Sequence, residues 1–130
     1  MRRLSMKKFV FPFPPSVNNY WRHVVIGRSV RVLISREGRE FRDKAVAAVG
    51  HVDERLTGKV EVIMRLCPPN RIRRDVDNYS KAVLDALTHA GVWVDDNQVD
   101  RIIVERGPVV PGGRADIVVR DYVPLEWENI

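Results

Sequence analysis

The sequence of 130 residues contains a single cysteine, Cys67, and only three histidines. One cysteine excludes an intrachain disulfide and a thiolate cage for a metal, so we expect Cys67 to be a small buried residue. The histidines are scattered along the chain and do not predict a zinc site. No GxxxxGK[ST] segment is present to hold nucleotide phosphates. Any chemistry must therefore rest on other residue types.

Long apolar runs are also missing. No segment approaches the roughly 18 residues that a membrane-spanning helix needs. The FVFPFPP segment that follows the basic N-terminus is too short and too rich in proline for a signal peptide. We expect a cytoplasmic protein that forms one domain over residues 1–130, with tails at about 1–6 and 122–130.

Lysine is scarce, with five lysines against 17 arginines. The net charge is +5 and the isoelectric point is about 9.8. Arginine can bind a phosphate through two parallel hydrogen bonds, whereas lysine acts as a point charge. The composition therefore indicates a nucleic-acid-binding protein, although a solvated arginine-rich surface would have the same composition.

Periodicity predicts an α+β fold with two main helices. The expected strands cover 7–11, 59–66, 99–105 and 115–121, and a hairpin covers 23–34. The first expected helix covers 36–49, capped by Ser35, with an apolar stripe at Phe41, Ala45, Ala48 and Val49. The second covers 78–90 and ends at Gly91. Residues 16–22 are expected to form a loop.

Four aspartates gather within 22 positions of this basic chain, directly after three arginines. The aspartates are Asp75, Asp77, Asp95 and Asp96, and the arginines are Arg71, Arg73 and Arg74. Hard oxygen ligands with cations beside them suit a divalent metal that acts on a phosphate. This cluster is the main functional signal in the sequence.

The spacing of these residues suggests how they would cooperate. In an extended segment, Asp75 and Asp77 point to the same side, roughly 6–7 Å apart. Asp77 also occupies the expected N-cap of the second helix, and Lys81 follows about one turn later. Asp95 and Asp96 can join them only if the strand from Val99 pairs beside the strand from Lys59.

Each of these features also has an ordinary structural explanation. Asp77 can be a helix cap, Asp95 and Asp96 part of a turn, and Lys81 a solvated side chain. Asp85 can support the site from behind or pair with Lys81. An EF-hand is excluded, because the sixth and twelfth positions counted from Asp75 are serine and alanine.

Two segments resemble the RusA family of Holliday-junction resolvases, small metal-dependent endonucleases that prophages often carry. The specific match is RRDVDNYSKAVLDALTHAGVWVDDNQV, and the weaker match is PFPPSVNNYWR. The order of elements between them also fits, so the resemblance covers about residues 8–120. Two departures are Ile72, which interrupts the basic run, and Asn70, where an acidic residue is common.

The resemblance implies a mixed sheet with helices on one side, a homodimer, and paired incisions across a four-way DNA junction. It implies Mg²⁺ or Mn²⁺ as cofactor and branched DNA as partner. The implied metal-binding and catalytic carboxylates are Asp75, Asp77 and Asp96, with Lys81 as the essential lysine. Asp95 has the weaker claim and supports the turn. The residues expected to contact DNA are Arg71, Arg73, Arg74, Asn18 and Arg22.

The aromatic residues have two interpretations. Tyr20 and Trp21 can contact DNA or a partner subunit, or they can belong to the core. Trp93, beside the paired aspartates, is expected to pack in the core.

Two other classes of function remain compatible with the residues themselves. A metal-dependent nucleotidyl- or phosphotransferase also uses a DxD pair with a later aspartate. Such an enzyme would need a glycine-rich nucleotide-binding turn before the pair, whereas this chain has Pro68-Pro69-Asn70-Arg71 there. A non-catalytic basic module would bind nucleic acid with a steep salt dependence and no metal requirement.

Overall fold

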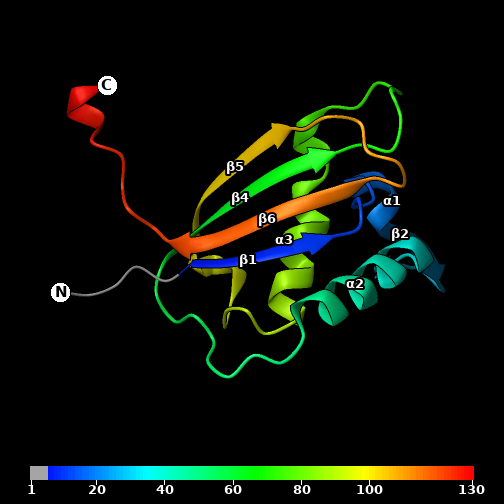
Figure 1. Cartoon of the computed structure of the whole chain (residues 1–130). Helices are drawn as coiled ribbons and strands as arrows, with labels where there is room; N and C mark the ends of the chain where they lie inside the picture. Colours follow the sequence, from blue (N-terminus) through cyan, green and yellow to red (C-terminus); the bar gives the residue numbers. More distant parts are fainter. Residues whose placement is uncertain (1–5) are drawn as a thin grey trace.

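A computed structural model describes residues 6–130 and contains a four-stranded mixed sheet (Figure 1). The strand order is β1-β6-β4-β5, where β1 is Met6–Phe11, β4 is Val60–Cys67, β5 is Val99–Arg106 and β6 is Arg114–Asp121. The β4 strand pairs parallel to β5 and antiparallel to β6, and β1 pairs antiparallel to β6. The predicted α+β fold with a mixed sheet is confirmed.

Two helices cover one face of this sheet (Figure 1). The α2 helix, Arg36–Val49, begins where predicted, because the Ser35 hydroxyl accepts a hydrogen bond of 2.9 Å from the backbone N–H of Gly38. The α3 helix, Ser80–His89, ends before Gly91, whose φ of 80° favours glycine. The second predicted helix starts too early, because Val76–Asn78 form a separate 3₁₀ turn, η1. Among the described helices, none has the length and apolar character to cross a bilayer.

A small hairpin stands apart from the main sheet. It consists of β2, Trp21–Ile26, and β3, Ser29–Ile34, as the β-branched residues predicted. The prediction of a loop over 16–22 is wrong. Val17–Tyr20 form one helical turn, α1, because the backbone N–H of Tyr20 bonds to the carbonyl of Ser16 at 2.8 Å, and β2 begins at Trp21.

The core lies between the helices and the sheet. Alternate residues of β4 face the helices, and Val60, Val62 and Met64 are completely buried there. Trp93 is also completely buried, as predicted, and its indole N–H donates to the Thr88 hydroxyl at 2.7 Å. Cys67 is buried and free. The expected apolar stripe of α2 is wrong at Ala48, which is exposed because it lies at the edge of the stripe, while Val49 is partly buried against the core.

The opposite face of the sheet carries a buried carboxylate. Glu61 on β4 is 2% exposed and accepts hydrogen bonds from Arg101 on β5 at 3.1 Å and from Arg120 on β6 at 2.7 Å. Burial opposes its ionisation, but the bonds from Arg120 and Arg101 outweigh this and hold the pKa of Glu61 below its ordinary value. This ion pair network fastens three neighbouring strands together.

The two expected tails differ. Residues 1–5 of the N-terminal tail lie outside the described residues, while Met6 already pairs with Arg120 in the sheet. At the other end, Val123–Ile130 are exposed and lead away from the sheet (Figure 1). Their only regular element is a 3₁₀ turn, η3, at Trp127–Asn129.

Candidate active site

The loop after β4 carries the first two aspartates to the C-terminal end of the parallel strands. Its start is held by the backbone N–H of Gly107, which donates to the carbonyl of Leu66 at 2.8 Å. Its end is held by Arg106 on β5, whose guanidinium donates to the carbonyl of Arg74 at 2.5 Å. Asp75 therefore occupies a defined place beside the ends of β4 and β5.

Asp75 and Asp77 present their carboxylates to solvent. Asp75 is extended, with φ of −92° and ψ of 130°, whereas Asp77 lies inside the η1 turn. We expected the two side chains to point to the same side of an extended segment, but only Asp75 is extended. The prediction that Asp77 caps α3 is wrong, because the cap position belongs to Tyr79 and no side chain bonds there. Neither carboxylate has a hydrogen-bond or ion-pair partner among residues 6–130.

The N-terminal motif meets the aspartate motif at this place. Asn18 lines an open hollow of about 340 Å³ together with Arg73, Arg74 and Asp75. Two segments more than 50 positions apart in the sequence thus form one surface, because α1 packs against α3. The weaker of the two sequence motifs lies beside the stronger one.

Lys81 projects from the first turn of α3. Its ammonium lies 6.0 Å from the centroid of the Trp21 ring, which is the outer limit of a cation–π contact. Trp21 is half-buried, and its neighbour Arg22 is exposed on the hairpin. The start of the hairpin, at Trp21, therefore lies near α3, which carries the predicted catalytic lysine.

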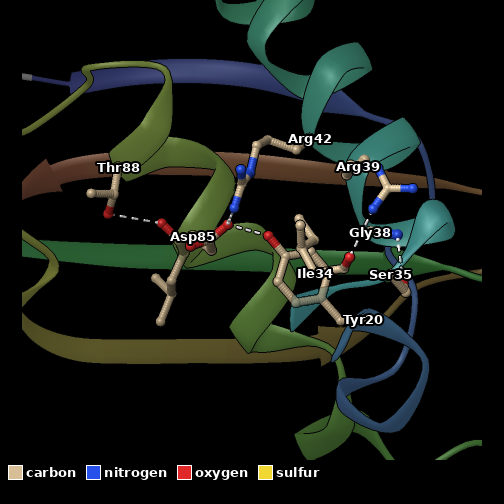
Figure 2. A network of polar contacts seen from close by, with 9 residues as sticks. Tyr20, Ile34, Ser35, Gly38, Arg39, Arg42, Asp85 and Thr88 are labelled. Carbon is tan, nitrogen blue, oxygen red and sulfur yellow. Dashed lines mark hydrogen bonds and ion pairs between the residues drawn. The ribbon is translucent and has the colours of Figure 1, made fainter. Parts of the chain in front are cut away.

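Asp85, one turn after Lys81, belongs to a polar network between three helices (Figure 2). Its carboxylate accepts a hydrogen bond from the Tyr20 hydroxyl and two from Arg42, at 2.9 and 3.2 Å. Burial and the adjacent Asp85 raise the pKa of Tyr20 well above its ordinary value. Of the two alternatives for Asp85, the pairing with Lys81 is wrong, because Arg42 on α2 reaches Asp85 instead.

Asp95 and Asp96 lie at the other end of the parallel strands. Asp95 accepts a hydrogen bond of 2.9 Å from the backbone N–H of Asn97 and caps the 3₁₀ turn η2, Asp96–Gln98. Gln98 closes the capping box and also donates to the carbonyl of Leu56, just before β4. The expectation that Asp95 supports the turn is confirmed.

Within one chain, Asp96 is remote from Asp75. The strand from Val99 does pair beside β4, as the sequence argument required, but Val99 meets Val60 while Asp75 follows the far end of β4. Six strand steps of about 3.3 Å separate these ends, or about 20 Å. Over residues 6–130, no three acidic, histidine or cysteine side chains lie close enough together to hold a metal ion.

The three predicted DNA-binding arginines have different surroundings. Arg71 and Arg73 are exposed and have no polar partner in the described part of the chain. Arg74 folds back and donates to the carbonyls of Asn70 at 3.3 Å and Ile72 at 3.0 Å. Its guanidinium also lies 5.5 Å from the centre of the Phe13 ring. Arg74 therefore shapes the loop, while Arg71 and Arg73 leave their charges available.

Several residues at this end were absent from the predicted site. Phe13 and Tyr79 lie with ring centroids 5.2 Å apart, and Arg106 joins them beside Asp75. Arg42, which binds Asp85 from α2, was also absent from the predicted site. No spacing rule links these residues, since each comes from a different element and only the fold brings them together.

Comparison with known proteins extends the sequence evidence. Residues 12–120 match the family described as endodeoxyribonuclease RusA. A crossover junction endodeoxyribonuclease RusA of Shigella sonnei (strain Ss046) is 39% identical over 120 residues, covering 91% of this chain and 97% of that protein. The protein of the same name from Escherichia coli (strain K12) is 38% identical with the same coverage. A crossover junction endodeoxyribonuclease of Enterobacteria phage 82 is 39% identical over 112 residues, 85% of this chain and 90% of that protein.

Proposed function

The chain belongs to the endodeoxyribonuclease RusA family, and we propose that it resolves four-way (Holliday) DNA junctions in recombination and repair. The reaction is hydrolysis of one phosphodiester in each of two strands related by symmetry. The observation that carries the proposal is the surface around Asp75, where unpaired carboxylates stand beside arginines and the N-terminal motif. This combination suits a phosphodiester held among cations.

Asp75 and Asp77 have the chemistry to hold a divalent cation. Mg²⁺ prefers oxygen ligands and often takes only one or two carboxylates, with waters and substrate phosphates completing its shell. Both side chains are exposed and make no competing bond within residues 6–130. When bound, Mg²⁺ or Mn²⁺ would supply Lewis-acid chemistry for phosphodiester hydrolysis.

The remaining charges have separate roles in this proposal. Lys81 donates a hydrogen bond to a nonbridging oxygen of the scissile phosphate or orients the attacking water. Arg71 and Arg73 bind the phosphates on either side, because their guanidinium groups have no partner in the described chain. Arg22 adds a further positive charge along the first segment of the chain, and Asn18 adds a neutral amide that can donate a hydrogen bond to DNA.

A second copy of the chain would complete the site. Asp96 precedes the start of β5 and Asp75 follows the end of β4, and these strand ends are about 20 Å apart, so all three carboxylates can act together only if two subunits contribute. A two-fold axis would then create two equivalent sites, as paired incisions require. The hairpin offers apolar surface for such contact, since Val25, Val30 and Val32 lie on one of its faces and are 71%, 65% and 54% exposed.

A junction-cleavage assay tests the proposal. Wild-type protein with Mg²⁺ should convert a synthetic four-way junction into two nicked duplexes and should leave a linear duplex of the same sequence intact. Asp75→Asn should bind the junction in metal-free buffer and fail to cut it when Mg²⁺ is added. Binding without cleavage by the wild type would favour the non-catalytic module, and nucleotide binding without cleavage would favour the transferase.

A further inference from the structure

An open cavity of about 470 Å³ lies directly beside Asp75. Its volume is within the range of about 300–1,000 Å³ that ligand pockets occupy. We infer that this cavity receives one nucleobase that leaves the stack at the branch point of the bound DNA. The inference rests on the proposed function, because it takes the DNA to be cut at Asp75.

The lining of the cavity suits a flat, weakly polar ring. Leu66 and Tyr79 are buried in its wall, and Phe13 is half-buried beside them. The tilted contact between Phe13 and Tyr79, with centroids 5.2 Å apart, gives the wall an aromatic surface. Unstacked bases in nucleic-acid-binding proteins are held by such aromatic surfaces and by guanidinium planes.

One guanidinium plane is already fixed in this wall. Arg74 lies 5.5 Å from the centre of the Phe13 ring, and its two hydrogen bonds to backbone carbonyls hold it there. Arg106 in turn bonds to the carbonyl of Arg74. The wall is therefore formed before any ligand arrives, which lowers the cost of ordering the site on binding.

The mouth of the cavity has the opposite chemistry. Arg71 and Arg73 line it with guanidinium groups that have no partner in residues 6–130. An apolar peptide would leave these charges without partners, and a free phosphate would leave the aromatic wall uncovered. A nucleotide within a DNA strand satisfies both parts, with its base inside and its flanking phosphates at the mouth.

The position of the cavity fits the branch point of a junction. Asp75 lines both this cavity and the hollow that contains Asn18, so a phosphodiester held at Asp75 would have its neighbouring base at the cavity mouth. Extruding a base costs a few kcal/mol in an intact duplex and less where pairing or stacking is already disturbed. A four-way junction provides such a base at the centre, and a linear duplex does not.

Fluorescence of 2-aminopurine tests this inference. The probe is placed in turn at each nucleotide of the branch point, and binding is measured in metal-free buffer, where the strands stay intact. Wild-type protein should raise the fluorescence at the nucleotide next to the cut at least about twofold, because the probe is quenched when stacked. No change at any branch-point position, with binding and Mg²⁺-dependent cutting intact, would overturn the inference and leave the proposed function standing.

A variant that fills the cavity provides the second test. Val109 lines the cavity and is 45% exposed, so Val109→Phe should occupy it without disturbing the core. It should bind the junction within about threefold of wild type, lose the fluorescence rise and cut about tenfold more slowly. The matched control, Val123→Phe, changes a residue 55% exposed in the C-terminal segment and should behave as wild type. A Val109→Phe protein with full fluorescence rise and full cutting rate would contradict the inference.

The two proposals fail in different ways. Suppose that the wild-type protein shows the fluorescence rise, that Val109→Phe removes this rise, and that the wild type cuts no junction with Mg²⁺ or Mn²⁺. This result would overturn the proposed function and would keep the cavity as a base-binding site.

Discussion

The hydroxyl of Tyr20 donates a hydrogen bond to the carboxylate of Asp85, 65 positions later in the chain. Arg42 binds the same carboxylate oxygen from α2 (Figure 2). The network joins the segment that carries Asn18 and Trp21 to the helix that carries Lys81. The N-terminal PFPPSVNNYWR segment is thereby held against the segment that carries the aspartates and Lys81.

Removing the Tyr20 hydroxyl should destabilise the protein. Tyr20→Phe leaves Arg42 on Asp85 but loses a charge-assisted bond, so the free energy of unfolding should fall by about 1–3 kcal/mol in urea titrations at pH 7. The control is Tyr122→Phe, whose hydroxyl has no hydrogen-bond partner within the described residues. Equal stabilities of the two variants would show that the bond contributes nothing.

The same bond should make the fold sensitive to alkali. Because the pKa of Tyr20 is raised in the folded state above its ordinary 10.0, its contribution is present below pH 10 and is lost as pH rises beyond it. Wild type should therefore lose stability above pH 10 more steeply than Tyr20→Phe. Parallel pH profiles of the two proteins would contradict this.

Glu61 should produce the opposite dependence at acid pH. Its folded pKa is lowered below the ordinary 4.5, so its contribution is present above pH 4.5 and is lost as pH falls through the folded pKa. Glu61→Gln should lower the free energy of unfolding by about 1–3 kcal/mol at pH 7, with the difference shrinking toward pH 3. Thermal melts at both pH values measure it, and a difference that persists at pH 3 would point to packing rather than charge.

Two inactive variants should restore activity when they are mixed. If Asp96 acts on the Asp75 of a second subunit, an Asp75→Asn chain paired with an Asp96→Asn chain contains one intact site. Random pairing of equal amounts should then restore about one quarter of the wild-type sites, detectable as single nicks on denaturing gels. If each site were built within one chain, every site in the mixture would be damaged and no nicking would return.

Substitutions of the neighbouring residues Asp95 and Asp96 should have different effects, one on stability and the other on cleavage. Asp95→Ala removes the acceptor for the Asn97 N–H and should destabilise the protein by about 0.5–2 kcal/mol, with cleavage retained. Asp96→Asn should leave the melting temperature unchanged and lower the cleavage rate at least about 100-fold. Full activity of Asp96→Asn would remove it from the proposed site.

Gly38 should tolerate no side chain. A Cβ atom there would lie 2.8 Å from both the Ile34 side chain and the carbonyl oxygen of Tyr20, where α2 contacts α1. Gly38→Ala should therefore destabilise the protein by about 1–3 kcal/mol through overpacking. Gly58→Ala is the matched control, because a Cβ atom there meets no other atom within 4 Å. Similar melting temperatures for the two variants would refute the predicted clash.

Local features of the fold were predictable from the sequence. Ser35 and Gly91 marked helix ends because caps and positive φ angles depend on neighbouring residues alone. The turn at Asp75–Asn78 was not predicted. Two aspartates separated by one residue fit an extended segment as well as a 3₁₀ turn, so their spacing does not distinguish the two conformations. Ala48 was misjudged for another reason: it lies at the edge of the apolar stripe, and the helical period does not say whether an edge side chain is covered.

The sequence by itself determined the main strands and the two long helices, the α+β class and the gathering of acids among arginines, because these depend on periodicity, composition and short spacing. Only the tertiary structure decided that Asn18 lies beside Asp75, that Arg42 and not Lys81 pairs with Asp85, and that an aromatic cavity opens next to Asp75. It also separated Asp96 from Asp75. Because β4 and β5 are parallel, the turn that enters β5 and the loop that leaves β4 lie at opposite ends of the sheet, and no spacing along the chain records that distance.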